Sequence, residues 1–202
     1  NAGFRQAKGE IIGLIDDDII VGKNWVKEIT SPYVDSNVGA VGGKINLEWR
    51  NGSPPAWFDP YQSWLGVLDY GPTIRNLNPG EHINAGNYSI RRNTLFEAGG
   101  YPPCDAPGDK LIGDGECGLN SKVWESGKQI IWNPHAEVQH INNAQAITIH
   151  YMRKRSRHHG MGAAYSLFRE KETTHFTIFK SVIRGLSQAA KNLLRSFQFK
   201  KI

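Results

Sequence analysis

Along the first part of the chain, apolar and polar positions follow a strand, helix, strand order. Residues 10–15 form a short apolar run, which is typical of a strand buried on both faces of a sheet. Residues 24–34 predict a helix, with Asn24 as its N-cap and apolar side chains on one side. Residues 38–49 predict the next strand, in which glycines let neighbouring backbones approach closely. This order is typical of an α/β domain.

Residues 50–80 separate this first part from a second group of regular elements. Five prolines and five aromatic residues stand in this stretch. The aromatic side chains can fill a core beneath a long connection, or they can form a platform for a sugar, and the sequence leaves both interpretations open. The elements expected after it are a strand over 83–90, a short helix opened by Asn93, a helix over 113–127, and two short strands over 129–133 and 136–141 that Pro134 separates.

The last part of the chain is strongly basic. Residues 150–202 hold 12 Lys and Arg against two Asp and Glu, whereas residues 1–149 hold 12 against 17. We therefore expect two units, an α/β domain over residues 1–150 and a basic helical extension over 151–202. Within the extension, residues 177–197 place apolar side chains on one helix face and basic side chains on the other.

Two interpretations of this amphipathic helix compete. It can lie in a membrane interface and attract anionic lipid, or it can pack on the flank of its own domain with its basic face in water. We favour peripheral contact with a membrane surface. A nucleic-acid partner is not expected, because the basic positions show no interleaved aromatic motif.

Composition limits the class of protein. Apolar residues make up 39% of the chain and charged residues 21%, as in soluble globular proteins. Cys104 and Cys117 fit no zinc-site spacing and are expected to be reduced thiols. No apolar run approaches the ~20 residues of a membrane span, and no signal peptide is visible, so we expect a cytoplasmic location. Because the chain begins at Asn1 without Met, we expect a fragment of a longer protein.

Three consecutive carboxylates, Asp16, Asp17 and Asp18, follow the buried strand at residues 10–15. Their charges repel one another, so the arrangement lowers stability unless a cation lies there. At the carboxyl end of a strand in an α/β sheet, such side chains point into the crevice where ligands bind. There they can hold Mg²⁺ or Mn²⁺, which bridge to phosphate oxygens. The alternative is a solvated acidic turn in which Asp18 caps the next helix, but the position after a buried strand favours metal–phosphate binding.

Two further motifs offer candidate chemistry. Asp114 and Glu116 stand among glycines at the start of an expected helix, where a carboxylate can act as a general base or simply favour the helix dipole. His140 ends an expected strand and can be a metal ligand, a proton shuttle or a structural residue. Taken alone, both motifs favour the structural interpretation.

The order of these motifs resembles that of the family 2 glycosyltransferases, inverting enzymes of the GT-A fold that transfer a sugar from a nucleotide sugar. The resemblance covers residues 1–165, and seven individually weak motifs stand in the family's order. The residues that match are, in chain order, Asn1, Gly3, Ala7 and Gly9; Asp16, Asp17 and Asp18; Trp25 in NWVKEI; Gly42 and Gly43 in AVGGKI; Gly86, Asn87, Arg91 and Arg92; Gly99, Gly100 and Tyr101; the acidic stretch GDGECGL at 113–119; and His140, followed by the basic stretch MRKRSRHHGMG.

The resemblance implies a fold and a metal site. The fold would be the C-terminal part of a GT-A domain, a Rossmann-like nucleotide-diphospho-sugar transferase domain with a mixed, mostly parallel sheet, followed by the basic helical tail. Asp16 and Asp18 would be the D-x-D carboxylates, one near the nucleotide ribose and one on a Mn²⁺ or Mg²⁺ ion that holds the diphosphate. Asp17 is an alternative ligand, because the register within a triplet is ambiguous. His140 would be a further contact to the metal or the diphosphate.

The resemblance also implies a catalytic base and contacts to the substrates. Glu116 is the favoured base, and Asp114 is the alternative, because the motif here is G-D-G-E where the family has G-E-D. Asn87 and Arg91 or Arg92 would line the donor or acceptor site. The donor would be a UDP-, GDP- or dTDP-sugar, and the acceptor a hydroxyl of a saccharide or of a lipid-linked saccharide.

A departure from the family motivates rival functions. The first half of the family's domain, which would supply the first strand and the base pocket, has no counterpart in this chain. We therefore expect poor donor binding by this polypeptide alone and an exposed apolar sheet edge. One rival is a non-catalytic nucleotide-sugar-binding or scaffold protein of the same fold. A nucleotidyltransferase is a second rival, but no glycine-rich triphosphate loop supports it.

Overall fold

The computed structural model describes residues 2–102, residues 115–169 and residues 180, 183, 184 and 187. Its strands are β1 (Ile11–Leu14), β2 (Ile19–Val21), β3 (Val38–Arg50), β4 (Arg75–Asn76), β5 (Tyr88–Arg91) and β6 (Gln129–Asn143). Its α-helices are α1 (Ala2–Gln6), α2 (Trp25–Thr30), α3 (Arg92–Glu97), α4 (Gly115–Glu125) and α5 (Ile149–Arg169). Its 3₁₀ segments are η1 (Ser31–Val34), η2 (Ala56–Leu65), η3 (Ala85–Asn87) and η4 (Ala144–Ala146).

The described strands form one mixed sheet. Its strand order is β1-β5-β3-β6-β2, and the short β4 pairs with β6. The mixed α/β architecture agrees with the sequence, but β3–β6 is the one parallel pairing in this sheet, instead of the expected majority. Parallel neighbours need a crossover connection, and α3 and α4 lie in the connection between β3 and β6.

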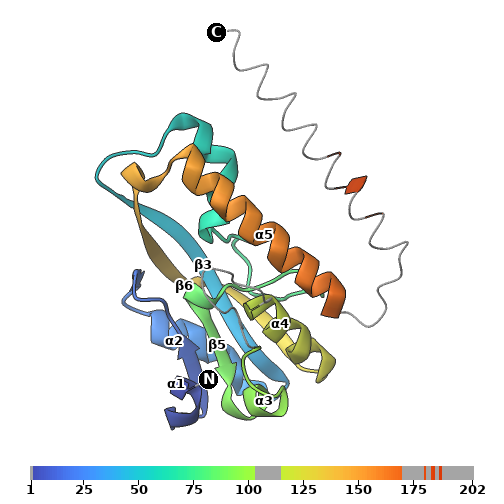
Figure 1. Ribbon diagram of the computed structural model, residues 1–202. Helices are drawn as coiled ribbons and strands as arrows, with labels where there is room; N and C mark the ends of the chain where they lie inside the picture. Colours follow the sequence, from blue (N-terminus) through green and yellow to red (C-terminus); the bar gives the residue numbers. More distant parts are fainter. Residues whose placement is uncertain (1, 103–114, 170–179, 181–182, 185–186, 188–202) are drawn as a thin grey trace.

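Helices cover both faces of the sheet, with α2 on one side and α3 and α4 on the other (Figure 1). The period of two along β3 and β6 sends neighbouring side chains to opposite faces. Ala40 and Ile130 pack into the core beneath α4, and Val41 and Ile131 pack into the core beneath α2. Burial on both faces explains why these strands are apolar throughout and do not alternate with polar residues.

β6 is one continuous strand where the sequence predicted two, and Pro134 lies inside it. Gly43 pairs with Asn133 and Ile45 pairs with Val138, so residues 134–137 bulge opposite a single residue of β3. Proline is tolerated at such a bulge because no ladder hydrogen bond needs its missing N–H. The bulge also explains why residue 43 is a glycine, because a Cβ at this position would lie 1.9 Å from the carbonyl oxygen of Ala136.

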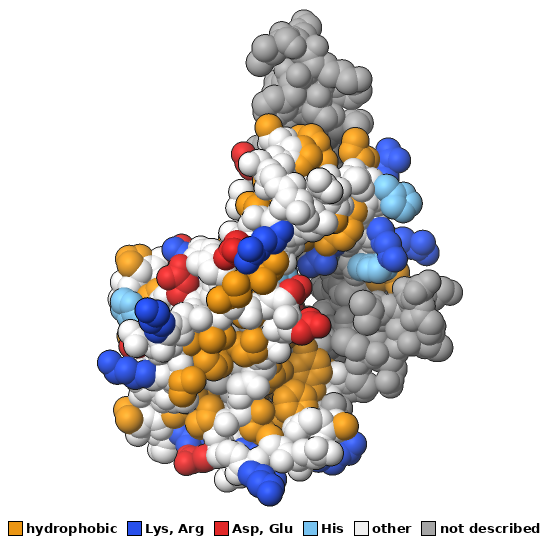
Figure 2. All heavy atoms as spheres, turned by 90° about the vertical axis from the view of Figure 1, so that its left-hand side faces the viewer, with side chains coloured by type: hydrophobic (Ala, Val, Ile, Leu, Met, Phe, Trp, Pro, Cys, Tyr) orange, Lys and Arg blue, Asp and Glu red, His pale blue; other side chains and the backbone are white. Residues whose placement is uncertain are grey.

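β1 is an edge strand that pairs with β5 alone among the described strands. Figure 2 shows hydrophobic side chains gathered on this side of the molecule, around α1, α2 and β1. Ile15, Val26 and Val34 are 38%, 67% and 94% exposed. β1 is thus an open edge in the described structure, but its own apolar side chains are buried (Ile12) or half-buried (Ile11 and Leu14), and the exposed apolar residues lie beside it.

The 50–80 stretch contributes to the core, as one of the two interpretations of the sequence held. Phe58 and Leu65 of η2 are buried in a small core that Met152 of α5 completes. Trp57 is 42% exposed, and the ring of Trp64 stacks on His159 of α5. The aromatic residues thus join η2 to α5, and the ring of Trp57 stays partly exposed. None of the helices in the described part of the chain is long and apolar enough to cross a membrane.

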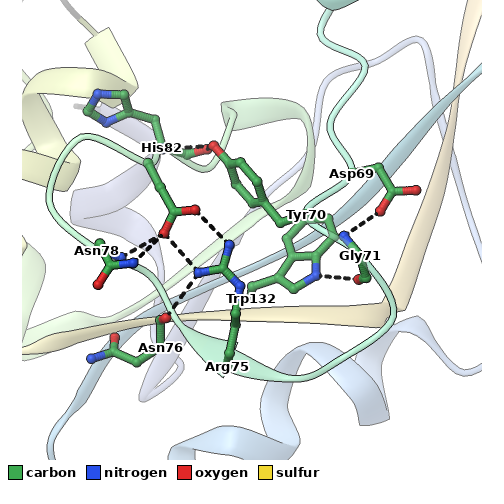
Figure 3. A network of polar contacts seen from close by, with 9 residues as sticks. Asp69, Tyr70, Gly71, Arg75, Asn76, Asn78, His82 and Trp132 are labelled. Carbon is green, nitrogen blue, oxygen red and sulfur yellow. Dashed lines mark hydrogen bonds and ion pairs between the residues drawn. The ribbon is translucent and has the colours of Figure 1, made fainter.

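A polar strap, formed by Tyr70, Gly71, Arg75, Asn78 and Glu81, holds the end of this stretch against the sheet (Figure 3). Arg75 makes two hydrogen bonds to the Glu81 carboxylate, at 2.8 and 2.6 Å, and its guanidinium lies over the ring of Tyr70. The backbone N–H of Asn78 also donates to Glu81, at 2.8 Å. The indole N–H of Trp132 donates to the carbonyl of Gly71 at 2.9 Å, which ties the strap to β6.

We expect the strap to make stability depend on pH through Glu81. Its hydrogen bonds to Arg75, and then to Asn78, lower the pKa of Glu81 from 4.5 to about 2. A depressed folded-state pKa stabilises the protein above the unfolded pKa, and this contribution is lost as the pH falls toward the folded value. Glu81→Gln should lower the melting temperature by roughly 1–3 °C at pH 7. The difference from wild type should shrink between pH 4.5 and about 2.

Thermal unfolding followed by circular dichroism tests this expectation, with Glu125→Gln at an exposed helix end as the control. A Glu81→Gln deficit that stayed constant down to pH 2 would show that the ion pair is not its source.

Candidate active site

The carboxylate triplet lies in the turn between β1 and β2. The carbonyl of Asp16 accepts the backbone N–H of Ile19 at 3.3 Å, which closes the turn. The carbonyl of Asp18 accepts the N–H of Ile141 at 2.8 Å, so the turn is attached to β6. β2 continues this pairing, with Ile19 opposite His140. The backbone therefore brings Asp18 and His140 together from distant parts of the sequence.

The side chains of Asp18 and His140 also face each other. Nε2 of His140 lies 3.2 Å from Oδ2 of Asp18, and Nδ1 lies 2.8 Å from the carbonyl oxygen of Leu65. Because a carbonyl only accepts, Nδ1 must carry the hydrogen in the neutral ring, which leaves the Nε2 lone pair facing a carboxylate. Two electron-pair donors at this distance require a shared positive charge, either a proton on the ring or a metal ion. A backbone carbonyl on the far ring nitrogen is the usual support of a metal-binding histidine.

Asp16 lies close to the same pair. Partial burial, followed by the charge of Asp18, raises its pKa, whereas His140 lowers it. A Cβ on Gly86 would lie 3.3 Å from Oδ2 of Asp16, so glycine leaves room for this carboxylate. Asp17 is exposed and also raises the pKa of Asp16. A bound cation would relieve this repulsion, which is the physical reason to expect one.

The donor set at this edge is small. Among the described residues, no group of three or more His, Cys, Asp or Glu side chains is close enough together to hold a metal ion. Asp18 and His140 would thus supply two ligands, and a bound ion would complete its shell from diphosphate oxygens and water. Mg²⁺ and its relatives are commonly held in this way, by one or two carboxylates together with substrate phosphates.

Glu116 lies in the first turn of α4, on the face of the sheet that also carries α3. Its carboxylate is half-buried and accepts a hydrogen bond from the hydroxyl of Tyr101 at 3.2 Å. The alternative base, Asp114, lies outside the described residues. The structure therefore gives Glu116 a defined environment and leaves the choice between the two bases to experiment.

Residues 82–87 connect the two candidate centres. Gly86 touches Asp16 on one side, and the side chain of Asn120 on α4 donates to the carbonyl of Ile83 at 3.0 Å on the other. Asn84 donates to the carbonyl of Gly66 at 3.2 Å, next to the segment that bonds His140. The carboxylate turn and α4 are thus positioned against one short piece of backbone.

Asn87 belongs to the scaffold, not to the donor site as the sequence led us to expect. It is fully buried, accepts from the indole N–H of Trp25 at 2.8 Å, and donates to the carbonyls of Lys44 and Ala136 at 3.1 and 2.6 Å. These bonds use both amide hydrogens and satisfy carbonyls that the bulge in β6 leaves without ladder partners. The amide therefore has no free donor for a substrate.

Arg91 and Arg92 also differ from the expectation. Arg91 pairs with Glu10 and donates to the carbonyls of Val38 and Tyr33, and β-pairing sets it opposite Ile11 at the start of β1. The carboxylate triplet follows the other end of that strand. Arg92 begins α3 at the same distant end, and its backbone N–H donates to Glu10. Both arginines therefore lie away from the carboxylates, and the structure assigns Arg91 a structural role.

Two residues near Glu116 carried no clear signal in the sequence. Tyr101 was matched only as the last residue of the Gly99–Gly100–Tyr101 motif, with no role assigned to it, and His82 preceded an expected strand. Burial lowers the pKa of His82, and the charge of Glu116 opposes this shift in part, so the two side chains lie within electrostatic reach. Only the fold brings these residues to the same helix face.

In sequence, this chain is similar to known glycosyltransferases. The model of the family described as "Glycosyl transferase family 2" matches residues 1–100. N-acetylgalactosaminyltransferase 7 of Drosophila melanogaster is 24% identical over 156 residues, which are 69% of this chain and 26% of the relative. The uncharacterized protein y4gI of Sinorhizobium fredii is 25% identical over 160 residues, which are 71% of this chain and 16% of the relative.

A solved structure shares the fold. The crystal structure of GalNAc-T7 with UDP, GalNAc and Mn²⁺ superposes with a TM-score of 0.51 at 14% identity and covers 89% of this chain and 38% of that one. This chain therefore spans well under half the length of each of these relatives. The family match over residues 1–100 and the shared fold support a family 2 glycosyltransferase domain of the GT-A fold in this chain.

Proposed function

We propose that this chain transfers a sugar from a nucleotide-sugar donor to a hydroxyl group of a saccharide or lipid-linked saccharide, with inversion at the anomeric carbon. One observation carries the proposal: Asp18 and His140, 122 positions apart, meet at 3.2 Å beside Asp16. Such a pair at the end of a sheet strand suits the binding of a diphosphate through a divalent cation.

Asp18 and His140 would hold Mn²⁺ or Mg²⁺. When bound, the ion would supply charge neutralisation for the diphosphate that leaves with the broken glycosidic bond. Asp16 is then the carboxylate nearest the nucleotide, and the position of Gly86 lets it approach. Asp17, which is exposed, remains the alternative ligand in this proposal.

Glu116 acts as the general base in the proposed reaction. It takes the proton of the acceptor hydroxyl while the acceptor oxygen bonds to the anomeric carbon and the bond to the donor phosphate breaks. The hydrogen bond from Tyr101 fixes the orientation of the carboxylate. A positioned base of this kind contributes about 10²-fold to 10⁴-fold to a rate.

The nucleotide is the least constrained part of the proposal, and UDP, GDP and dTDP all fit a metal–diphosphate site. A UDP-sugar is favoured, because the GalNAc-T7 structure that shares this fold holds UDP, GalNAc and Mn²⁺. The open ring of Trp57 and the stacked pair of Trp64 and His159 offer apolar faces of the kind on which a sugar packs, and we assign them to the acceptor side.

A screen of donors tests the proposal. The purified protein is incubated with UDP-, GDP- and dTDP-sugars, and release of the nucleoside diphosphate is followed with Mn²⁺ or Mg²⁺, with EDTA, and after the metal is restored. Because this polypeptide alone is expected to bind the donor poorly, we expect slow turnover with at least one UDP-sugar, which should be lost in EDTA and recovered with Mn²⁺. Metal-dependent binding by calorimetry without any turnover would support the non-catalytic alternative. The absence of both binding and turnover would contradict the proposal.

Peripheral contact with the inner face of a membrane remains part of the proposal. Residues 177–197 lie outside the described residues except at 180, 183, 184 and 187. Support comes from the sequence alone, in which the last 53 residues carry 12 basic and two acidic side chains. Anionic lipid attracts clusters of Lys and Arg by about 1 kcal/mol per residue near the surface.

A further inference from the structure

One face of α4 carries a polar stripe of three residues. Glu116, Asn120 and Trp124 stand four residues apart, so they lie above one another on the same side of the helix. Asn120 is fully buried and donates to the carbonyl of Ile83, and Trp124 packs against the imidazole of His82 at a centroid distance of 5.8 Å. The stripe therefore rests on residues 82 and 83 over most of its length.

The backbone of His82 is held by the strap. The hydroxyl of Tyr70 donates to the carbonyl of His82 at 3.0 Å and accepts its N–H at 3.1 Å. Tyr70 in turn packs edge-on against Trp132 and lies under the Arg75 guanidinium. Figure 3 shows the His82 ring pointing away from this network. The backbone of His82 is thus fixed by Tyr70, and the ring of His82 faces α4.

Polar atoms without partners gather at this contact. In the described part of the chain, four buried side-chain atoms here make no hydrogen bond: Nδ1 of His82, the hydroxyl of Tyr88, Oδ1 of Asn120 and Nε1 of Trp124. Such atoms are rare in folded proteins, and a structural core would use apolar side chains in their place. Three of the four atoms, on His82, Asn120 and Trp124, lie along the contact between residues 82–83 and α4.

Charge links this contact to Glu116. Burial lowers the pKa of His82, so its ring is neutral near pH 7, and the charge of Glu116 partly opposes the shift. Around Tyr70, whose hydroxyl bonds the His82 backbone, lie Arg75 and Glu81 of the strap and Cys117 of α4. Among all of these, Glu116 is the group whose charge acts on His82.

We propose that His82 is a positioning residue for Glu116: through its contact with the polar stripe of α4, His82 sets the orientation of the Glu116 carboxylate without touching either substrate. The proposal rests on the proposed function for its catalytic consequence. The contact between His82 and α4 does not depend on that function, so the two can be tested separately.

The coupling itself is tested without turnover. The imidazole of His82 is titrated by NMR in the wild type, in Glu116→Gln and in Glu125→Gln, and its signal is assigned by its absence from His82→Gln. Removing the charge of Glu116 should lower the pKa of His82, whereas the change at the exposed Glu125 should not. Equal His82 titration in all three proteins would overturn the proposal, whether or not sugar transfer is observed.

The catalytic consequence is tested with two substitutions of the same residue. His82→Phe keeps a ring against Trp124 but removes both nitrogens, and we expect kcat to fall by about 10-fold to 100-fold with an unchanged KM for the donor. His82→Gln restores a polar side chain and should recover part of kcat. His135→Gln, at an exposed histidine of β6, is the matched control.

Two results would contradict a positioning role. A His82→Phe variant with wild-type kcat would do so, as would a His82→Gln variant no more active than His82→Phe, since that would mean packing alone matters. If the wild type transfers no sugar, the proposed function fails, and the NMR comparison still decides whether His82 and Glu116 are coupled.

Discussion

Replacing Asp18 with asparagine is expected to abolish metal-dependent binding of the donor and to lower the rate of transfer by about 1,000-fold. Asparagine keeps the shape of the side chain but removes the negative charge that faces Nε2 of His140. A bound metal supplies several kcal/mol of charge stabilisation in reactions of this class, and each 1.36 kcal/mol is a factor of ten in rate. Calorimetry with UDP and Mn²⁺ measures the binding, and initial rates of UDP release measure the transfer.

Two companion variants make this test specific. His140→Gln should resemble Asp18→Asn, and the double variant should lose little more, because both residues act through one site. Asp17→Asn should bind the donor nearly normally, because Asp18, not Asp17, contacts the histidine. If Asp17→Asn lost Mn²⁺-dependent binding while Asp18→Asn kept it, Asp17 would be the ligand and our assignment of the triplet would be wrong. Melting temperatures of all variants report whether the fold is intact.

The sequence was sufficient to predict the carboxylate end of the candidate site. Three acidic residues after a fully apolar strand conflict with local stability, and such conflicts concentrate at functional positions. His140 could be linked to them only through the family resemblance, because nothing local connects residues so far apart. The structure supplies the physical link, which is the pairing of Ile19 with His140 and the bond from Ile141 to Asp18.

Residues whose partners are distant backbone groups could not be assigned from the sequence. Asn87 and Arg91 looked like ligand-binding residues because they are polar and stand near glycines. Their partners are carbonyl groups that the bulge in β6 and the end of β3 leave exposed, and a sequence does not reveal where a bulge lies. Pro134 was the one visible sign of that bulge, and it predicted a break where the strand in fact continues.

The edge strand also marks a limit of sequence reasoning. An apolar run such as residues 10–15 predicts burial on both faces, yet β1 has a strand on one side only in the described structure, and Ile15 is 38% exposed. The burial of a strand in a sheet depends on its neighbouring strands, and the apolar run does not identify these neighbours. Because β1 leads directly into the triplet, whatever lies along its open edge also adjoins the proposed donor site.

The proposed base is expected to separate binding from chemistry. Glu116→Gln keeps the size of the side chain and an oxygen that can accept from Tyr101, but it cannot take a proton from the acceptor. We therefore expect kcat to fall by about 10²-fold to 10⁴-fold while the KM for the donor and the Mn²⁺-dependent binding of UDP stay near their wild-type values. Initial rates at varied donor and acceptor, together with calorimetry, give these quantities.

Substitution of two other carboxylates shows whether the loss of kcat in Glu116→Gln comes from general-base catalysis. Glu125→Gln lies on the same helix at an exposed position, so it should leave kcat unchanged and excludes a general effect of charge on α4. Asp114→Asn tests the alternative base two positions earlier. A large loss of kcat in Asp114→Asn with little in Glu116→Gln would move the base to Asp114. A loss in neither would remove general-base catalysis by this motif and leave α4 a scaffold, since its dipole alone would then explain why acidic residues begin it.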